Sequence, residues 1–161
     1  MIETKKFIIS ILVENYAGTL SKVAGLFTRR GYNIDSLNVA ETQDPKISRI
    51  TVAVTGDGYI IEQITKQLNK LINVIKITTL EQDTSVQREL MMLKVKSDGT
   101  KRSEIIQIVN IFKANIIDVA QKTMIVCITG DEDKNNAFLE LMKPFGIIEM
   151  TRTGPTALER G

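Results

Sequence analysis

The sequence contains one order of predicted elements twice, and this repetition constrains the fold more than any other feature. Asn33-Ile34 matches Asn115-Ile116, a shift of 115 − 33 = 82 residues. Further along, Thr55-Gly56-Asp57 matches Thr129-Gly130-Asp131, a shift of 129 − 55 = 74 residues. A shorter hairpin in the second half, lacking the turn at 43–46, would produce the difference of eight residues. The chain is therefore predicted to hold two domains of the same topology.

The hydrophobic pattern gives the order of elements in each half. Apolar residues alternate over 7–13, which is typical of a half-buried strand. From Thr19 they recur at helical spacing, and Arg29-Arg30-Gly31 supplies the cations and the glycine that are typical of a helix end. In the first half we expect strands at 7–13, 33–41, 48–55 and 74–80, with helices after Thr19 and after Gly58. In the second half we expect strands at 89–96, 116–119, 124–129 and 146–152, with helices over 104–114 and after Asp131.

This order is βαββαβ in both halves, so the fold class is α+β with two ferredoxin-like domains. The predicted domains are residues 1–81 and 85–161, joined near Gln82-Asp83-Thr84-Ser85. A domain of about 60 to 75 residues buries only about 60% of its unfolded surface. A single sheet with helices on one face also leaves its other face and its edges open. Either the sister domain or a second chain should cover them, and we expect a homodimer or a larger assembly.

Composition excludes several classes of function. The 161 residues include no histidine and one cysteine, which removes Ser-His-Asp and Cys-His catalysis, most zinc chemistry and any disulfide framework. The formal net charge is +2, with no basic stripe for nucleic acid or membrane. No apolar run approaches the roughly 18 residues of a membrane span, and the start MIETKK is no secretory signal. We expect a cytoplasmic protein, although a removed organellar transit peptide would leave no trace.

The stretch Asn15-Tyr16-Ala17-Gly18 before the first helix has two interpretations. Asn and Gly form turns and cap helices in most proteins. Alternatively, the glycine lets a ligand approach the backbone, the free amides at the helix start hold a carboxylate, and the Asn amide adds a directed hydrogen bond. The second half has Ser97 and Thr100 at the matching places, so a polar site of this kind would belong to the first domain.

Other polar features have simpler interpretations. Asn33 begins the second strand and could be a turn residue, since Asn tolerates unusual backbone angles, and Asn115 occupies the same place in the repeat. Cys127 lies among apolar neighbours and is expected to be packed and inert. Asp131-Glu132-Asp133 suits a helix start better than a divalent metal site. The strands that would carry stacking aromatics in an RNA-binding domain of this plan have none.

The segment VENYAGTLSKVAGLFTRRGYNIDSLNVAETQDPKISRITV resembles the ACT domain of the small, regulatory subunits of acetohydroxyacid synthase (acetolactate synthase). The resemblance continues through QRELMMLKV, IFKANIIDV and EMTRTGPTALERG, and so covers essentially the whole chain. It implies a non-catalytic subunit that activates a large catalytic subunit and makes it sensitive to a branched-chain amino acid, usually valine. The pathway is valine, leucine and isoleucine synthesis. Thiamine diphosphate, Mg²⁺ and FAD would belong to the large subunit, and no cofactor is expected in this chain.

The resemblance also implies the effector-binding residues. In such ACT domains two copies pair, and the effector lies at their interface. Residues from the turn and helix start of one copy would hold its polar end, while Asn33 and Ile34 would come from the partner's second strand. Helix-start amides suit the carboxylate, Asn or backbone carbonyl oxygens suit the ammonium, and Leu20 or Ile34 suits the side chain. The expected set is Asn15, Ala17, Gly18, Thr19, Leu20, Asn33 and Ile34.

The second domain lacks the Asn and Gly of the first turn, so we expect no effector there. By resemblance, its role is support and contact with the catalytic subunit. A stand-alone tandem ACT-type amino-acid sensor acting on another partner is the leading alternative, and an enzyme is disfavoured by the lack of histidine. Valine, leucine and isoleucine differ by about one methylene, a difference worth only ~1–3 kcal/mol, so the sequence leaves the effector open among them.

Overall fold

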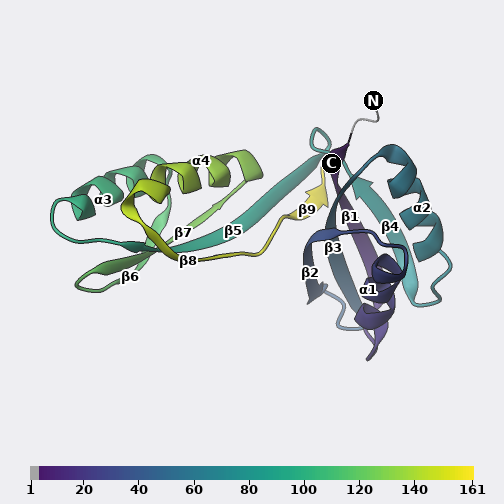
Figure 1. Ribbon diagram of the computed structural model, residues 1–161. Helices are drawn as coiled ribbons and strands as arrows, with labels where there is room; N and C mark the ends of the chain where they lie inside the picture. The colour runs from purple at the N-terminus through teal and green to yellow at the C-terminus, as the bar shows by residue number, and fades with distance from the viewer. Residues whose placement is uncertain (1–3) are drawn as a thin grey trace. The chain divides into compact units, whose positions relative to one another are not determined.

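The computed structural model describes residues 4–161, and these residues form two compact units. The first unit contains the described residues as far as Val86 together with Gly154–Gly161, and the second contains Gln87–Thr153. The first follows the order βαββαβ, as predicted (Figure 1). Its elements are β1 (Lys5–Glu14), α1 (Thr19–Arg29), β2 (Ile34–Glu41), β3 (Ile47–Gly56), α2 (Gly58–Leu68) and β4 (Val74–Leu80).

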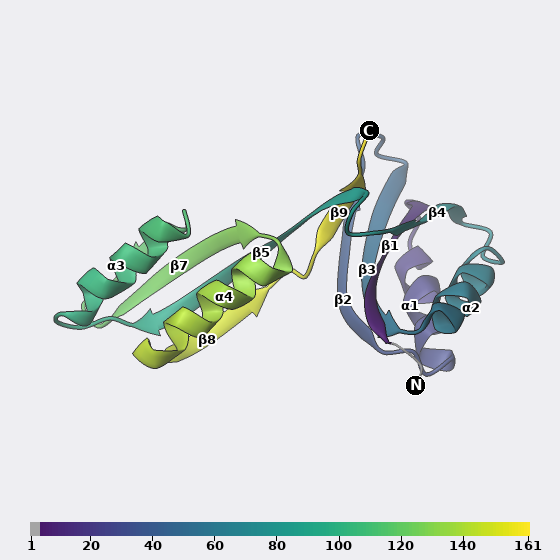
Figure 2. The same ribbon diagram turned by 90° about the horizontal axis from the view of Figure 1, so that it is seen from above.

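The four strands of the first unit form an antiparallel sheet of order β2-β3-β1-β4. Helices α1 and α2 cover one face of this sheet (Figure 2). Alternate strand residues point to opposite faces, so every second residue of β1 and β3 enters the core under the helices. This core is closed by apolar residues of both helices and includes Ile9, Ile11, Val23, Phe27, Ile50, Val52, Ile64 and Leu68. The predicted strands and helices of this half are confirmed within a few residues.

Helix α1 ends just before Gly31, the glycine that was predicted to terminate it. Gly31 has a φ of 71°, in the left-handed region that L side chains rarely adopt. The Tyr32 N–H donates to Phe27 O at 3.0 Å and the Gly31 N–H donates to Thr28 O at 3.2 Å. These bonds satisfy carbonyl groups that the helix end would otherwise leave unpaired. The chain then turns directly into the edge strand β2.

The second unit repeats the plan with most of β5 (Ser85–Lys96), whose first two residues belong to the first unit, and with α3 (Lys101–Ile111), β6 (Asn115–Val119), β7 (Thr123–Gly130), α4 (Glu132–Met142), a short 3₁₀ helix at Lys143–Phe145 and β8 (Ile147–Arg152). The strand order is β6-β7-β5-β8, with α3 and α4 over one face of the sheet (Figure 1). Met91, Leu93, Val126 and Phe138 lie in a core that is separate from that of the first unit. The helix predicted over 104–114 begins earlier, at Lys101. It ends at Ile111 because Lys113, two residues later, has a left-handed φ of 55°.

The end of the chain differs from the prediction. Residues 85–161 were expected to form the second domain, but Gly154–Gly161 group with the first unit. These residues include β9 (Thr156–Glu159), a strand that pairs with β5 and that the sequence pattern did not predict. A four-residue strand that follows Gly154-Pro155 has too short an alternation to stand out from a turn.

The C-terminal residues also cover part of a sheet face that the sequence left open. β9 lies on the face of the first sheet opposite α1 and α2 (Figure 2). Ala157 of β9 packs with Ile8, Ala53 and Leu80, all of them nearly fully buried. Arg160 N–H donates to Thr84 O at 2.8 Å. We expected the sister domain or a second chain to cover this face, and a short segment of the same chain provides some of that cover.

Candidate functional site

The candidate site begins where β1 leads into α1. Gly18 is the N-cap residue with a φ of 87°, and a Cβ built on it would meet no atom within 4 Å. No side chain caps this helix, and its first turn contains no acidic residue. The Lys22 N–H donates to Gly18 O, while the amides of Leu20 and Ser21 have no hydrogen-bond partner in the described chain. Unpaired amides at the positive end of a helix dipole attract an anion such as a carboxylate.

Asn15 lies beside this helix start and is held by the turn between β2 and β3. Its side-chain Nδ2 donates to Pro45 O at 3.0 Å and to Glu41 Oε1 at 3.3 Å, and its backbone N–H donates to Lys46 O at 2.8 Å. Because both bonds use the side-chain nitrogen, the side-chain oxygen Oδ1 of Asn15 remains available to accept a hydrogen bond. Glu41 was not predicted as a site residue, and its carboxylate adds an anionic group next to Asn15.

The other residues predicted around the helix start have different environments. Leu20 is 42% exposed and Ala17 is exposed, so both are accessible to a ligand. Thr19 is 4% exposed, its N–H donates to Tyr16 O at 3.2 Å, and its Oγ1 accepts from Asn73 Nδ2 at 3.4 Å. Both polar groups of Thr19 are thus engaged inside the chain, which gives this residue a structural function in the fold.

Asn33 and Ile34 lie at the opposite end of the sheet from Asn15 within one chain. Ile34 pairs with Val54 near the end of β3, whereas Glu14, the residue before Asn15, pairs with Ile47 at its start. Val54 and Ile47 are seven residues apart, or about 23 Å along a strand. A single chain therefore does not bring the two halves of the predicted site together.

An antiparallel partner strand at the edge of β2 would bring them together. β2 is an edge strand, and Glu41 at its end pairs with Ser48, level with Val13. If a second β2 runs antiparallel alongside, its first residues come level with the last residues of the first copy. Asn33 and Ile34 of that copy would then lie near Glu41 and Asn15. The edge position of β2 leaves it open to such a pairing, and a site completed by two copies stays a prediction.

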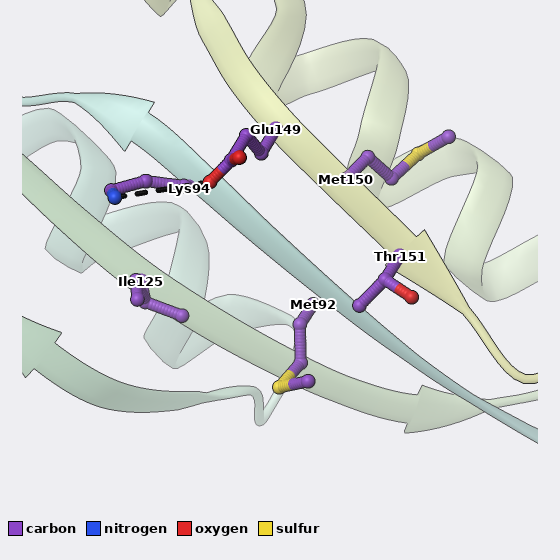
Figure 3. A pocket seen from close by; sticks show the side chains of 6 residues that line it. All are labelled: Met92, Lys94, Ile125, Glu149, Met150 and Thr151. Atoms are coloured by element: carbon purple, nitrogen blue, oxygen red, sulfur yellow. Dashed lines mark ion pairs between the residues drawn. The ribbon is translucent and has the colours of Figure 1, made fainter.

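The second unit carries a pocket of about 330 Å³ on its sheet, remote in sequence from the predicted residues. It is lined by Met92, Lys94, Ile125, Glu149, Met150 and Thr151 (Figure 3). Lys94 Nζ and Glu149 Oε2 are 3.8 Å apart across it, and both side chains are partly exposed, so this ion pair contributes little to stability. Met92 and Lys94 pair in register with Cys127 and Ile125, on the sheet face away from the core. Cys127 is half-buried on this face.

A polar network closes the other end of the same sheet. Glu89 is 7% exposed and accepts from Arg152 Nε at 3.0 Å and Nη2 at 2.8 Å. Asn135 Nδ2 donates to Glu89 O and Oε2, and Asn136 Oδ1 accepts from Arg152. The hydrogen bond to Glu89 raises the pKa of Arg152 above its ordinary value. This arrangement joins β5, α4 and β8.

Two classes of site find no support in the described part of the chain. Residues 4–161 contain no group of three or more His, Cys, Asp or Glu side chains placed to hold a metal ion. The side chains of Asp131-Glu132-Asp133 therefore form no such group. Asp131 instead caps α4 through a bond from Lys134 N–H at 2.8 Å. Among the same residues, each helix is too short or too polar to cross a bilayer.

Comparison with known proteins gives matches over both units. Residues 9–76 match the family model of the AHAS small subunit-like ACT domain, and residues 88–161 match that of the small subunit of acetolactate synthase. The chain is 53% identical over 160 residues to a probable acetolactate synthase small subunit of Methanothermobacter thermautotrophicus, covering 99% of this chain and 95% of that protein. It is 47% identical to the acetolactate synthase small subunit of Mycobacterium bovis, covering 98% and 94%. The crystal structure of the small subunit from Thermotoga maritima superimposes with a TM-score of 0.90 at 42% identity, covering 98% of each chain.

Proposed function

Because the chain belongs to the family of acetolactate synthase small subunits, which are regulatory and leave catalysis to a large subunit, we propose that it confers feedback control by a branched-chain amino acid. In this proposal it binds the large subunit, raises its activity and makes it sensitive to valine. The assembly acts in the cytoplasm on the pathway to valine, leucine and isoleucine. Thiamine diphosphate, Mg²⁺ and FAD are assigned to the large subunit, and this chain supplies only the effector site.

The observation that carries the proposal is the open, uncapped start of α1. A free amino acid presents a carboxylate, an ammonium and a small apolar side chain. The carboxylate faces the unpaired Leu20 and Ser21 amides, with Gly18 leaving the approach clear. The ammonium faces the Asn15 carbonyl oxygen, and the Glu41 carboxylate near Asn15 Nδ2 strengthens the attraction. The exposed Leu20 side chain and Ile34 of a second copy receive the apolar side chain.

Two copies of the chain are part of this proposal. The effector site as described needs the β2 edge of a second copy, since Asn33 and Ile34 lie far from Asn15 in one chain. Regulation then follows from a difference in affinity, because valine favours one arrangement of the pair and the large subunit favours another. A coupling of about 1–3 kcal/mol changes affinity roughly 5- to 150-fold.

The test is isothermal titration calorimetry of the full chain with valine, leucine and isoleucine, followed by activity assays of the reconstituted holoenzyme with each. We expect saturable binding of at least one of the three, and inhibition by the amino acid that binds most tightly. A chain that binds none of them, or that leaves the large subunit equally active with and without it, contradicts the proposal. Recovery of a partner other than a large thiamine-diphosphate enzyme from native extract would instead favour a stand-alone sensor.

A further inference from the structure

The residues that return to the first unit, 154–161, are here called the C-terminal strap. They pass over the open face of the first sheet and make contact with the same strand, β2, whose first residues belong to the candidate effector site. The strap follows directly after β8, the last strand of the second unit. It is therefore joined covalently to β8 through Thr153, and it contacts β2 through hydrogen bonds.

The contact between the strap and β2 is specific. Asn38 Nδ2 donates to Pro155 O at 3.1 Å and to Gly154 O at 3.4 Å, and it is half-buried there. Gly154 has a φ of 75°, and a Cβ on it would lie 2.2 Å from Ser36 Cβ and 2.4 Å from Ser36 Oγ. A glycine is thus required both by the backbone conformation and by the close approach of β2. We call this contact, made by Ser36 and Asn38 with Gly154 and Pro155, the latch.

The residues next to the latch are anchored on the side of the second unit. Thr153 N–H donates to Leu90 O at 3.0 Å and Leu90 N–H donates to Thr153 Oγ1 at 3.1 Å. Arg152 is held by Glu89 through two bonds. Thr153 is bound to β5 of the second unit and Gly154 to β2 of the first, so no free residue separates the two anchored positions. A shift of β2 must therefore be absorbed by the latch or passed on to β8.

We infer that the C-terminal strap, through its latch on β2, transmits effector occupancy in the first unit to the second unit. This inference rests on the proposed function and adds the route by which the same site regulates the holoenzyme. Asn38 lies four residues beyond Ile34 on β2, or about 13 Å along the strand. When an effector fixes the start of β2 against a second copy, the latch fixes the strap as well. The latch then responds to the effector site at one end and to the second unit at the other. Allosteric coupling requires such an element, whose equilibrium two separate sites influence.

The first test is hydrogen exchange of the full chain with and without valine. We expect valine to slow amide exchange about 5-fold or more in 36–40 and 154–158 as well as around Asn33. If calorimetry shows that valine binds but exchange in 154–158 does not change, the inference is wrong while the proposed function stands. If the wild-type chain binds none of the three amino acids, the proposed function fails and the inference falls with it.

The second test separates transmission from simple cover of the sheet. Asn38→Leu removes both latch bonds, and Gly154→Ala forces β2 and the strap apart. Ala40→Leu is the matched control, because Ala40 is exposed two residues further along the same face. For Asn38→Leu we expect a calorimetric Kd for valine within about 3-fold of wild type, but inhibition of the holoenzyme weakened about 5-fold or more. Ala40→Leu should retain full inhibition.

A purely structural strap predicts a different pattern. Both latch variants would then lower the thermal unfolding temperature yet keep the valine inhibition of the wild type, and this result would overturn the inference. Should Gly154→Ala fail to fold, Asn38→Asp keeps the shape of the side chain while placing a carboxylate against two carbonyl oxygens. It should weaken inhibition as Asn38→Leu does.

Discussion

The turns that precede α1 and α3 occupy the same place in the two units but differ in their hydrogen bonds. In both, a backbone N–H donates to a lysine carbonyl of the facing hairpin, from Asn15 to Lys46 O and from Ser97 to Lys122 O, each at 2.8 Å. Beyond that shared bond they diverge. The first turn leaves the α1 amides open, with Gly18 as an uncrowded N-cap.

The second turn is filled by an arginine. Arg102 Nε donates to Ser97 Oγ at 3.0 Å, and Nη2 donates to Ser97 O and Gln121 O at 3.0 Å. A cation therefore occupies the turn that is left open in the first unit. Repetition of a fold thus does not repeat its local structure, since one copy leaves its helix-start amides open and the other uses its own side chain to join the turn to the hairpin.

The largest expected effect comes from closing the open turn with a charge. Gly18→Asp places a carboxylate where the effector carboxylate would lie, and like charges at close range cost several kcal/mol. We expect valine affinity to fall about 100-fold or more, with loss of holoenzyme inhibition, as measured by calorimetry and activity assays.

Gly18→Asn is the matched control, because Asn has the same shape without the charge and tolerates left-handed φ. The strain of a side chain at a φ of 87° costs about 1–2 kcal/mol in either variant. Thermal unfolding should therefore be similar for both. Equal valine sensitivity in Gly18→Asp and the wild type would remove the α1 start from the site.

The next effect concerns the filled turn. Arg102→Ala removes the side-chain bonds to Ser97 and to the hairpin carbonyl groups of Ala120 and Gln121, while the backbone bond from Ser97 to Lys122 O remains. Hydrogen bonds from a charged group contribute about 1.5–3 kcal/mol each when they are well shielded. Because Arg102 is only half-buried, we expect the free energy of unfolding to drop by about 2 kcal/mol in total, measured by urea titration. Valine binding should stay unchanged. A loss of valine affinity would mean that the second turn takes part in effector binding.

The sequence predicted this contrast only in part. The repeat, the strand alternation and the Gly31 stop were enough to predict both βαββαβ units, because local periodicity determines which residues can be buried. The absence of Asn and Gly from the second turn indicated that it differs. That Arg102 fills it could not be inferred, since the arginine donates to the carbonyl groups of Ala120 and Gln121, which approach it only once the hairpin has folded.

The same reason explains what was missed in the first unit. Glu41 and Pro45 contact Asn15 through a strand register that the sequence pattern does not define to a single residue. The contacts of the C-terminal strap with the first unit were not predicted, because the residues that hold it are distant in sequence. Asn38 and Gly154 are 116 residues apart, and no local pattern reports such a contact.

A smaller effect is expected from the side chain that supports the open turn. Asn15→Ala removes one carbonyl oxygen that would face the effector ammonium, together with the bonds to Glu41 and Pro45. One hydrogen bond is worth about 1 kcal/mol, so valine affinity should fall roughly 5-fold in calorimetry. Asn15→Asp tests the role of charge, since a carboxylate beside Glu41 should also attract the ammonium. Unchanged affinity in Asn15→Ala would exclude Asn15 from the site.

The smallest effect tests whether a glycine alone makes a site. Thr100 is the N-cap residue of α3 but forms no side-chain cap bond, so Thr100→Gly should change the free energy of unfolding by less than about 0.5 kcal/mol. The valine stoichiometry should also stay as in the wild type, because Arg102 still fills the turn. The double variant Thr100→Gly with Arg102→Ala opens the second turn fully. Since that turn still lacks the counterpart of Asn15, we expect no second binding event in calorimetry, and one that did appear would show that open helix amides suffice.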